Sequence, residues 1–573
     1  MKVSDYIAKF LYNQGVSHVF EVVGGMITHL IDSIYSQDRI CIVSTHHEQA
    51  AAFAAEAMAR ITGVPGVALA TSGPGATNLL TGIGSCYFDS TPAVFITGQV
   101  NRSELKGSRL IRQLGFQETD IVSMARPITK AVFQVQSPEE IPLLLEKAFI
   151  LALSGRRGPV LLDIPMDIQR ADISTEVPSQ LSGVDAEEVD YQGINELLSD
   201  LSLSQRPLIL AGGGIRSAQL TDLFRTFVEQ VKAPVVNSLM AVDVLPYSHP
   251  LHVGLIGSYG NRWANLAIGR ADFLLVIGSR LDIRQTGSDT SAFKGNRTIY
   301  HVDCEPDEIN NRVTGCHAIM AHLRPFLRTA IQKSEQVIFK ERLNWLAEIN
   351  ENRCLWPDTA ELLNTPGINP NELMHQISAT AQQATAFAVD VGQHQMWAAQ
   401  SLELDPTQRF LTTGGMGAMG FALPAAIGAS MARQGQPIVM IAGDGGFQIN
   451  IQELQTVVHN RLPIKMIILN NQCLGMVRQF QQCYFDARYP STYWGYSAPN
   501  FVDVAQAYGV EGCTVEDPLE VQSALDQMWR DPRSPFLLQV MIDRFTNTYP
   551  KIAFGLPITE MEPFVNPVDM EGT

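Results

Sequence analysis

The sequence has little that points to a membrane, a secretory route or nucleic acid. No uninterrupted apolar run in its 573 residues approaches the ~18 that a membrane-spanning helix requires. The amino terminus leads straight into an amphipathic helical pattern without a signal or transit segment, so we expect a cytoplasmic protein. The eight cysteines form no Cys-x-x-Cys pair, which argues against a disulfide framework and against a zinc site. A net charge of −17 argues against nucleic acid as a partner.

What the sequence does contain is a globular α/β pattern. Hydrophobic residues make up 46% of the chain and charged residues 17%, as is typical of globular proteins. Short apolar strands alternate with helical patterns, which predicts doubly wound parallel sheets. We expect three such domains joined by a polar linker and a helix-rich connector, and a proline-containing tail that lies over the surface. The domains are predicted at 1–170, 196–335 and 369–548, the linker at 171–195, the connector at 336–368 and the tail at 549–573.

The third predicted domain contains a glycine-rich turn between two strands. Strand 437–442 leads into Gly443-Asp444-Gly445-Gly446, a helix is expected at 450–460, and strand 464–469 ends at Asn470-Asn471. A strand–turn–helix–strand unit of this kind places backbone amides where a diphosphate binds. The Asp444 carboxylate and the Asn471 amide oxygen, at the ends of adjacent strands, suit Mg²⁺, which prefers oxygen ligands. The alternative is a glycine-rich turn that binds nothing.

This turn resembles the signature of thiamine diphosphate (ThDP) enzymes. The resemblance implies that the glycines bind the cofactor's diphosphate and that Cys473 adds its backbone carbonyl to the metal ligands. Met419 would lie beneath the cofactor, although an isolated methionine is more often an ordinary core residue. Gly24 and Gly25 would approach the cofactor from a partner subunit, with Val23 where the family usually has proline. The other cofactor-binding residues implied are Val391, Gly392, Gln393, His394, Gly417, Gly443, Gly445, Gly446, Leu474, Gly475 and Met476.

A glutamate follows a predicted strand in the first domain. Strand 40–44 ends in Thr45-His46-His47-Glu48, and an alanine-rich helix is expected at 49–60. A glutamate at a helix start is often only a favourable partner for the helix dipole. By resemblance to ThDP enzymes, however, Glu48 bonds the aminopyrimidine ring and activates the cofactor.

Further segments resemble, in order along the chain, the catalytic subunit of acetolactate synthase (acetohydroxyacid synthase). They are Ser72-Gly73-Pro74-Gly75 and the stretches 116–120, 126–130 and 155–160. This resemblance implies that Phe116, Gln117 and Lys130 face the substrates; the alternative for Lys130 is a solvated surface lysine. Phe480 stands where the family typically has tryptophan, and the smaller ring leaves more room for the second substrate.

The middle domain contains glycines after a strand, but the full Gly-x-Gly-x-x-Gly dinucleotide spacing fails at Ser217. Its segments resemble those that bind FAD in acetolactate synthases, whereas simpler relatives leave this domain empty. Arg284 would reach toward the active site, where a guanidinium suits a carboxylate or a phosphate. The residues implied to contact FAD are Arg156, Gly212, Gly213, Gly214, Ser238, Leu239, Met240, Gly257, Ser258, Tyr259, Gly278, Arg280, Asp282, Asp303 and Cys304.

The resemblance implies a ThDP-, Mg²⁺- and FAD-binding carboligase. It would decarboxylate pyruvate and transfer the two-carbon unit to an acceptor carbonyl, with acetolactate as the default product. The acceptor could instead be a ketone such as a nucleotide-linked keto-deoxysugar, because Phe480, Tyr259 and Val23 suggest an altered second-substrate site. A nicotinamide dehydrogenase lacks its complete fingerprint, and a non-catalytic relative would not be expected to keep Glu48 and Asp444. The family also implies a homodimer or homotetramer with active sites between subunits, and often a regulatory subunit.

Overall fold

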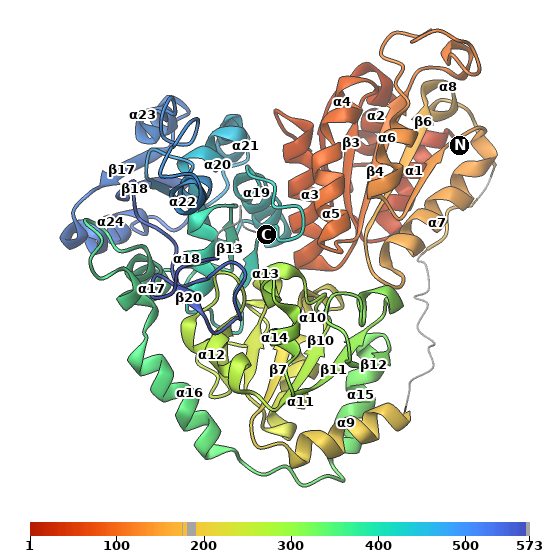
Figure 1. Cartoon of the computed structure of the whole chain (residues 1–573). Helices are drawn as coiled ribbons and strands as arrows, with labels where there is room; N and C mark the ends of the chain where they lie inside the picture. Colours follow the sequence, from red (N-terminus) through yellow and green to blue (C-terminus); the bar gives the residue numbers. More distant parts are fainter. Residues whose placement is uncertain (175, 180–190, 569–573) are drawn as a thin grey trace.

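The computed structural model describes residues 1–174, 176–179 and 191–568. The N-terminal and C-terminal domains lie side by side, and the central domain lies beneath both (Figure 1). Each domain contains a six-stranded sheet of parallel strands covered by helices. The predicted fold class, three doubly wound parallel-sheet domains, is therefore confirmed. Within the described residues, no helix is long and apolar enough to cross a membrane.

The N-terminal domain has the strand order β2-β1-β3-β4-β6-β5. Strands β3, β4 and β6 are buried along their whole length because helices cover both faces, which explains their continuous apolar sequences. The strands are β1 (His18–Val22), β2 (Cys41–Ser44), β3 (Gly66–Ala70), β4 (Ala93–Gln99), β5 (Ala131–Gln134) and β6 (Pro159–Pro165). The helices are α1 (Val3–Asn13), α2 (Thr28–Gln37), α3 (Glu48–Thr62), α4 (Pro74–Asn78), α5 (Leu80–Phe88), α6 (Ile121–Ala125), α7 (Ile141–Leu153) and α8 (Met166–Gln169).

The C-terminal domain repeats this architecture. Its strand order is β14-β13-β15-β16-β18-β17, which is the N-terminal order when strands are numbered within each domain. The strands are β13 (Ala386–Val389), β14 (Arg409–Leu411), β15 (Ile438–Gly443), β16 (Ile464–Asn470), β17 (Glu511–Val515) and β18 (Phe536–Met541). The helices are α17 (Pro370–Thr380), α18 (Gln393–Ser401), α19 (Ala422–Ala432), α20 (Asp444–Ile449), α21 (Leu454–His459), α22 (Gly475–Tyr484), α23 (Phe501–Ala507) and α24 (Val521–Met528).

The central domain has a different order, β12-β11-β10-β7-β8-β9. Numbered within the domain and read from β9, this is 3-2-1-4-5-6, the order of dinucleotide-binding folds, whose ligands bind beside the first strand. The strands are β7 (Pro207–Ala211), β8 (Val235–Asn237), β9 (His252–Leu255), β10 (Phe273–Ile277), β11 (Thr298–Asp303) and β12 (His317–Met320). The helices are α9 (Tyr191–Leu203), α10 (Gly213–Ser217), α11 (Thr221–Val231), α12 (Arg262–Arg270), α13 (Ile283–Thr286), α14 (Thr290–Lys294) and α15 (Leu323–Ser334).

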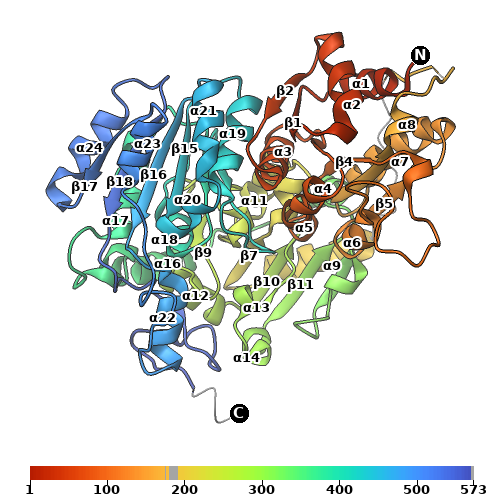
Figure 2. The same cartoon turned by 90° about the horizontal axis from the view of Figure 1, so that it is seen from above.

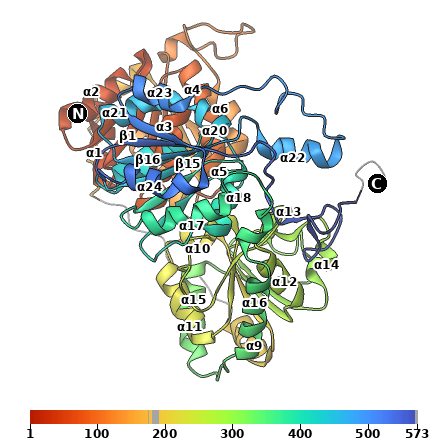
Figure 3. The ribbon, with the colours of Figure 1, turned by 90° about the vertical axis from the view of Figure 1, so that its left-hand side faces the viewer.

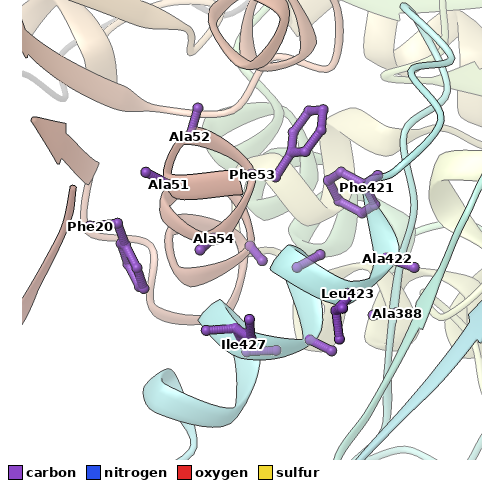
Figure 4. Packing of buried hydrophobic residues seen from close by; sticks show 14 of the residues in the cluster. Phe20, Ala51, Ala52, Phe53, Ala54, Ala388, Phe421, Ala422, Leu423 and Ile427 are labelled. Atoms are coloured by element: carbon purple, nitrogen blue, oxygen red, sulfur yellow. The ribbon is translucent and has the colours of Figure 1, made fainter. Parts of the chain in front are cut away.

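Helices α3 and α19 join the two outer domains. The rings of Phe53 and Phe421 meet edge to face with centroids 5.4 Å apart (Figure 4). A Cβ placed on Gly428 would lie only 2.0 Å from the Ala54 carbonyl oxygen, so the helices approach closely because this residue is glycine. Beside this contact the His46 backbone N–H donates to Glu453 at 2.9 Å. The start of α3 is thereby fixed against the C-terminal domain.

The segments between and after the domains differ from the prediction. Helix α9 begins at Tyr191, inside the predicted linker, whose residues 175 and 180–190 lie outside the described part of the chain. The connector contains helix α16 (Leu343–Leu355), as predicted. The tail forms a small antiparallel hairpin, β19 (Lys551–Ile552) with β20 (Met561–Glu562). Because Met561 is 1% exposed and belongs to a core cluster of the central domain, the tail is anchored there and does not simply lie over the surface.

Candidate active site

The glycine-rich turn is the first turn of a helix and not a loop. Helix α20 begins at Asp444, directly after β15, and a short 3₁₀ turn (Ile451–Glu453) separates it from α21. The predicted single helix at 450–460 is therefore wrong in its start and its continuity. The break falls at Asn450, whose side-chain amide donates to the Gly420 carbonyl at 2.7 Å. The early start leaves the first-turn amides of the motif at the helix N-terminus, where anions bind favourably.

Asp444 and Asn471 follow neighbouring parallel strands, β15 and β16, and therefore lie at the same sheet edge. Asp444 is 2% exposed, and burial raises the pKa of its carboxyl group to about 7. Its Oδ2 atom has no hydrogen-bond partner among the described residues. The Asn471 Oδ1 atom accepts from the Cys473 backbone N–H at 3.2 Å. A buried carboxylate oxygen without a partner, beside an amide oxygen, fits a hard cation such as Mg²⁺.

The side chains around the motif are tightly packed. A Cβ on Gly445 would lie 2.5 Å from the Leu474 Cδ2 atom and 3.3 Å from the Met419 Cε atom, and one on Gly446 would lie 2.6 Å from Asp390 Oδ1. The structure thus brings Met419, Leu474 and the glycines together. A side chain at either glycine would displace one of these neighbours.

Sequence reasoning missed Asp390, a fully buried carboxylate that organises the turns of this domain. It accepts hydrogen bonds from the backbone N–H groups of Val391 at 2.9 Å, Gly420 at 3.0 Å and Ala422 at 2.8 Å. Burial raises its pKa to about 6. It therefore fixes the turn at 391–392 against the one that carries Met419. The sequence feature that could have identified Asp390 is a carboxylate directly after strand β13.

His394 lies against the same motif. Burial lowers its pKa to about 3, so the imidazole is neutral at physiological pH. Its Nε2 atom is without a partner in the described part of the chain. A Cβ on Gly443 would lie 3.0 Å from its Nδ1 atom, so the ring faces the turn between β15 and α20. A neutral imidazole has a single N–H, so Nε2 can donate to a bound anion in the tautomer that carries the ring proton there.

Glu48 is the first residue of α3, with His47 as the N-cap. Its carboxylate is 8% exposed, and Oε2 accepts a hydrogen bond from the Asn78 amide at 2.9 Å. Asn78, at the end of α4, was also missed from the sequence. The close packing of Gly75 against Glu48 Oε1 leaves the carboxylate little freedom to turn. These contacts belong to the N-terminal domain itself.

Gly24, Gly25, Phe116 and Gln117 lie outside the α-helices and strands of this domain. Gly24 packs so closely against Thr71 that a Cβ would lie 2.5 Å from the Thr71 Cβ, whereas Gly25 has open space around it. Phe116 is 80% exposed, and Gln117 adopts a left-handed φ of +64°. A single exposed apolar side chain is common on protein surfaces, so the exposure of Phe116 alone assigns it no ligand.

Lys130 is half-buried and contacts the end of a helix. Its ammonium group donates to the carbonyl oxygens of Leu151 at 2.5 Å and Ser154 at 2.6 Å, at the end of α7. Burial lowers its pKa. A cation at a helix C-terminus is favourable because the last carbonyls lack helical partners. These contacts give Lys130 a structural role, and its substrate role stays a prediction.

A cavity of ≈ 240 Å³ lies where the three domains meet. Most of the residues predicted to contact FAD line it. They are Arg156, Gly213, Gly214, Ser238, Leu239, Met240, Ser258, Tyr259, Gly278, Arg280, Asp282, Asp303 and Cys304, together with the predicted Arg284. Gly212 and Gly257 do not line the cavity but permit the backbone to pack there, since a Cβ on either would lie within 2.2 Å of a backbone oxygen.

Buried ion pairs from all three domains also line this cavity, and sequence reasoning missed them. Asp243 of the central domain bonds Arg216 and Arg409, each at 2.9 Å. In the N-terminal domain Arg60 pairs with Asp89 at 3.1 Å. These charges are spread over 350 residues of sequence, and no local pattern joins them. They fix the relative positions of the domains around the cavity.

Phe480 contributes to an aromatic cluster on α22. It is 41% exposed, and its ring centroid lies 4.8 Å from that of Tyr484, which in turn lies 6.4 Å from Phe554 in the tail. Figures 2 and 3 both show α22 beside the tail, near α13 of the central domain. Arg284 belongs to α13 and is exposed. Aromatic side chains from two segments, α22 and the tail, therefore lie next to each other.

Comparisons with known proteins agree with this geometry. Three family models match: the N-terminal TPP binding domain of thiamine pyrophosphate (that is, ThDP) enzymes at residues 1–124, their central domain at 194–330 and their C-terminal TPP binding domain at 390–540. The acetolactate synthase large subunit of Lactococcus lactis is 35% identical over 97% of this chain and 95% of its own. The isozyme 2 large subunit of Escherichia coli is 36% identical over 98% of this chain and 99% of its own. A probable acetolactate synthase large subunit of Methanocaldococcus jannaschii is 37% identical over 95% of this chain. The chain therefore belongs to the thiamine pyrophosphate enzyme family and is related over nearly its whole length to acetolactate synthase large subunits.

Proposed function

We propose that this protein is a ThDP- and Mg²⁺-dependent carboligase that decarboxylates pyruvate and joins the two-carbon unit to an acceptor carbonyl. The observation that carries the proposal is the buried Asp444 carboxylate, whose Oδ2 atom lacks a partner in the described structure and lies at the same sheet edge as Asn471. When bound, ThDP supplies a nucleophilic carbon and an electron sink. The relatives named acetolactate synthase support pyruvate as the donor and acetolactate as the default product.

Residues of the chain would bind the metal and the diphosphate and exchange the proton of the cofactor. Asp444, the Asn471 amide oxygen and the Cys473 carbonyl would hold Mg²⁺, and the first-turn amides of α20 with His394 would bind the diphosphate. Glu48, oriented by Asn78, would exchange the proton of the aminopyrimidine ring. Met419 would support the cofactor from below.

We propose FAD in the central cavity. The 3-2-1-4-5-6 strand order and the close glycine packing at Gly212 support a dinucleotide beside β7. Arg156, which lines the cavity and pairs with Glu308 at 2.7 Å, would reach the flavin's phosphates from the N-terminal domain. The flavin would hold the domains together and carry no electrons in the reaction.

The acceptor remains between two candidates. The curated relatives favour a second pyruvate. The exposed Phe480 in place of the family's tryptophan favours a bulkier ketone, for instance a nucleotide-linked keto-deoxysugar. Phe480→Trp should leave acetolactate formation intact and lower the yield with a bulky ketone. If the wild type never joins a ketone, the second candidate is refuted.

The resemblance to ThDP enzymes, whose active sites lie between subunits, supports active sites completed by a second copy of the chain. We therefore propose a cytoplasmic homodimer or homotetramer. A regulatory subunit is proposed from the relatives' description as large subunits. Light scattering on the purified chain tests the assembly; a fully active monomer would contradict it.

The direct test is CO₂ release from pyruvate with ThDP and Mg²⁺, with products identified by mass spectrometry. Glu48→Gln should retain ThDP binding and lose turnover. Unchanged turnover in this variant would refute the assignment, and absence of any turnover in the wild type would favour a non-catalytic relative.

A further inference from the structure

Three buried side-chain amides form a chain that ends at the proposed metal ligand Asn471. Gln393, Gln479 and Asn471 are 4%, 1% and 8% exposed, so water does not serve as their main partner. An amide has an oxygen that accepts and a nitrogen that donates, and which of them faces a given point depends on the group's orientation. Only the oxygen of Asn471 can ligate a cation. The orientation of this amide is therefore a functional variable.

The series of amides starts at backbone groups, whose N–H can only donate and whose carbonyl can only accept a hydrogen bond. The Thr548 N–H donates to Gln479 Oε1 at 2.9 Å, and Gln479 Nε2 donates to the Thr548 carbonyl at 3.0 Å. This two-point contact fixes the Gln479 amide in one orientation. A rotation by 180° would place its NH₂ group against the Thr548 N–H and its oxygen against the Thr548 carbonyl. The neighbouring Thr546 carbonyl accepts from Gln393 Nε2 at 2.9 Å. Arg478, which is 0% exposed, also donates to that carbonyl and holds the segment in place.

Each amide then fixes the next. Gln393 Nε2 also donates to Gln479 Oε1 at 3.3 Å, so its nitrogen must face the carbonyl of Thr546 and its oxygen must face away. That oxygen accepts from Asn471 Nδ2 at 3.2 Å. With its nitrogen committed to Gln393, Asn471 turns Oδ1 to the Cys473 N–H, at the sheet edge that also carries Asp444. The Gln393 amide is also closely packed, because a Cβ on Gly475 would lie 1.9 Å from Gln393 Oε1.

We propose that Gln479 is a positioning residue that, through Gln393, holds the Asn471 amide with its oxygen toward the metal. This inference rests on the proposed function, specifically on the Mg²⁺ site. The orientation of a metal ligand by hydrogen bonds behind it is general, and loss of such a partner typically weakens metal affinity about 10- to 100-fold. Here the support reaches back two amides, and its anchors are the backbone groups of Thr546 and Thr548.

The test is a double-mutant cycle read by metal binding and not by activity. The intact oligomer is stripped of divalent cations, saturated with ThDP and titrated with Mn²⁺, while electron paramagnetic resonance reports free Mn²⁺. Gln479→Met should weaken Mn²⁺ affinity up to about 10-fold, because Gln393 loses one of its two partners and keeps only the Thr546 carbonyl. Asn471→Asp removes the need for orientation, since both carboxylate oxygens can ligate. In that background Gln479→Met should change the affinity by less than about threefold.

A purely structural role for Gln479 predicts equal losses in both backgrounds, and that result would overturn the proposal. The matched control is Gln408→Met. Gln408 is a glutamine of the same domain, 4% exposed, that donates to the carbonyls of Ala381 and Ala384 at 3.1 Å and lies outside the amide chain. It should leave Mn²⁺ affinity unchanged. If Gln479→Met fails to fold, Gln393→Met breaks the next link and should show the same dependence on the Asn471→Asp background. Absence of Mn²⁺ binding in the wild type would instead refute the proposed metal site itself.

Discussion

Replacing Arg60 by methionine removes a buried cation that two carboxylates share. Arg60 bonds Glu56 and lies 3.1 Å from Asp89, and the two acidic side chains are 0% and 1% exposed. Without the guanidinium both carboxylates stay buried and unpaired, and removing one partner of such a cluster costs about 3–5 kcal/mol. Arg60 also donates to the Thr412 carbonyl across the domain interface, so this loss should fall on the N-terminal and C-terminal domains together.

The same cluster makes the loss depend on pH. Burial raises the pKa of Glu56 from 4.5 to about 7, even with Arg60 present. Because the folded pKa is the higher one, the contribution of Glu56 to stability is complete below pH 4.5 and is lost as pH rises through about 7. At about pH 6 the protonated Glu56 no longer needs a counter-ion, whereas at about pH 8 it does. The loss of unfolding free energy caused by Arg60→Met should therefore be larger at the higher pH.

The assay is urea unfolding of the cofactor-free protein, followed by far-UV circular dichroism at both pH values. The matched control is Arg102→Met, which breaks the Arg102–Asp167 pair of 2.7 Å, whose arginine is 44% exposed. Exposed pairs contribute only about 0–1 kcal/mol. If Arg60→Met costs no more than Arg102→Met at about pH 8, or if its deficit does not grow with pH, the reasoning from buried charge is refuted.

Three other changes test separate parts of the structure. His375 lies 2.8 and 2.9 Å from two carboxylates that raise its pKa. The stability that these contacts give the folded protein is therefore complete below about pH 6.5 and lost above the raised pKa. His375→Gln should lower the melting temperature at about pH 6 and leave it unchanged at about pH 9. A Cβ on Gly213 would lie 2.8 Å from Met240 Cβ in the central cavity, so Gly213→Val should reduce co-purified flavin absorbance with the circular dichroism unchanged; undiminished flavin would contradict the proposed FAD site. Lys130→Met should lower the melting temperature without changing KM for pyruvate, because the ammonium group caps α7; a higher KM at unchanged stability would support the substrate role.

The sequence was sufficient for the sheets because their strands are apolar, short and bounded by turns. It misplaced the start of α20, where glycines are typical of a loop. In the structure Asp444 is the first helical residue, and an acidic residue at that position is favoured by the helix dipole. The helix then breaks at Asn450 because its side chain bonds Gly420, a partner thirty residues earlier. Local propensity cannot include such a partner.

The same limit explains the site residues and contacts that were missed. Gln479 is bonded to Thr548, sixty-nine residues away, and Asp390 to Gly420 and Ala422. Lys130 has a sequence context that resembles a substrate residue, but its ammonium group lies at the end of a helix twenty-one residues later. In each case the role is decided by what the tertiary fold brings within hydrogen-bond distance.

The motif residues could be identified from the sequence, but the lack of hydrogen-bond partners at their buried polar atoms could not. A fold normally pairs its buried polar groups, because leaving one unpaired costs free energy. Around the β15–α20 turn this protein leaves Asp444 Oδ2 and His394 Nε2 unpaired within the described residues, while the neighbouring amides of Gln393 and Gln479 are fully committed. The first two atoms are those that a cation and an anion would satisfy, and the committed amides keep the ligands pointed at them. In the proposed site a metal-bound diphosphate would pair both atoms, and its binding would offset the cost of leaving them unpaired.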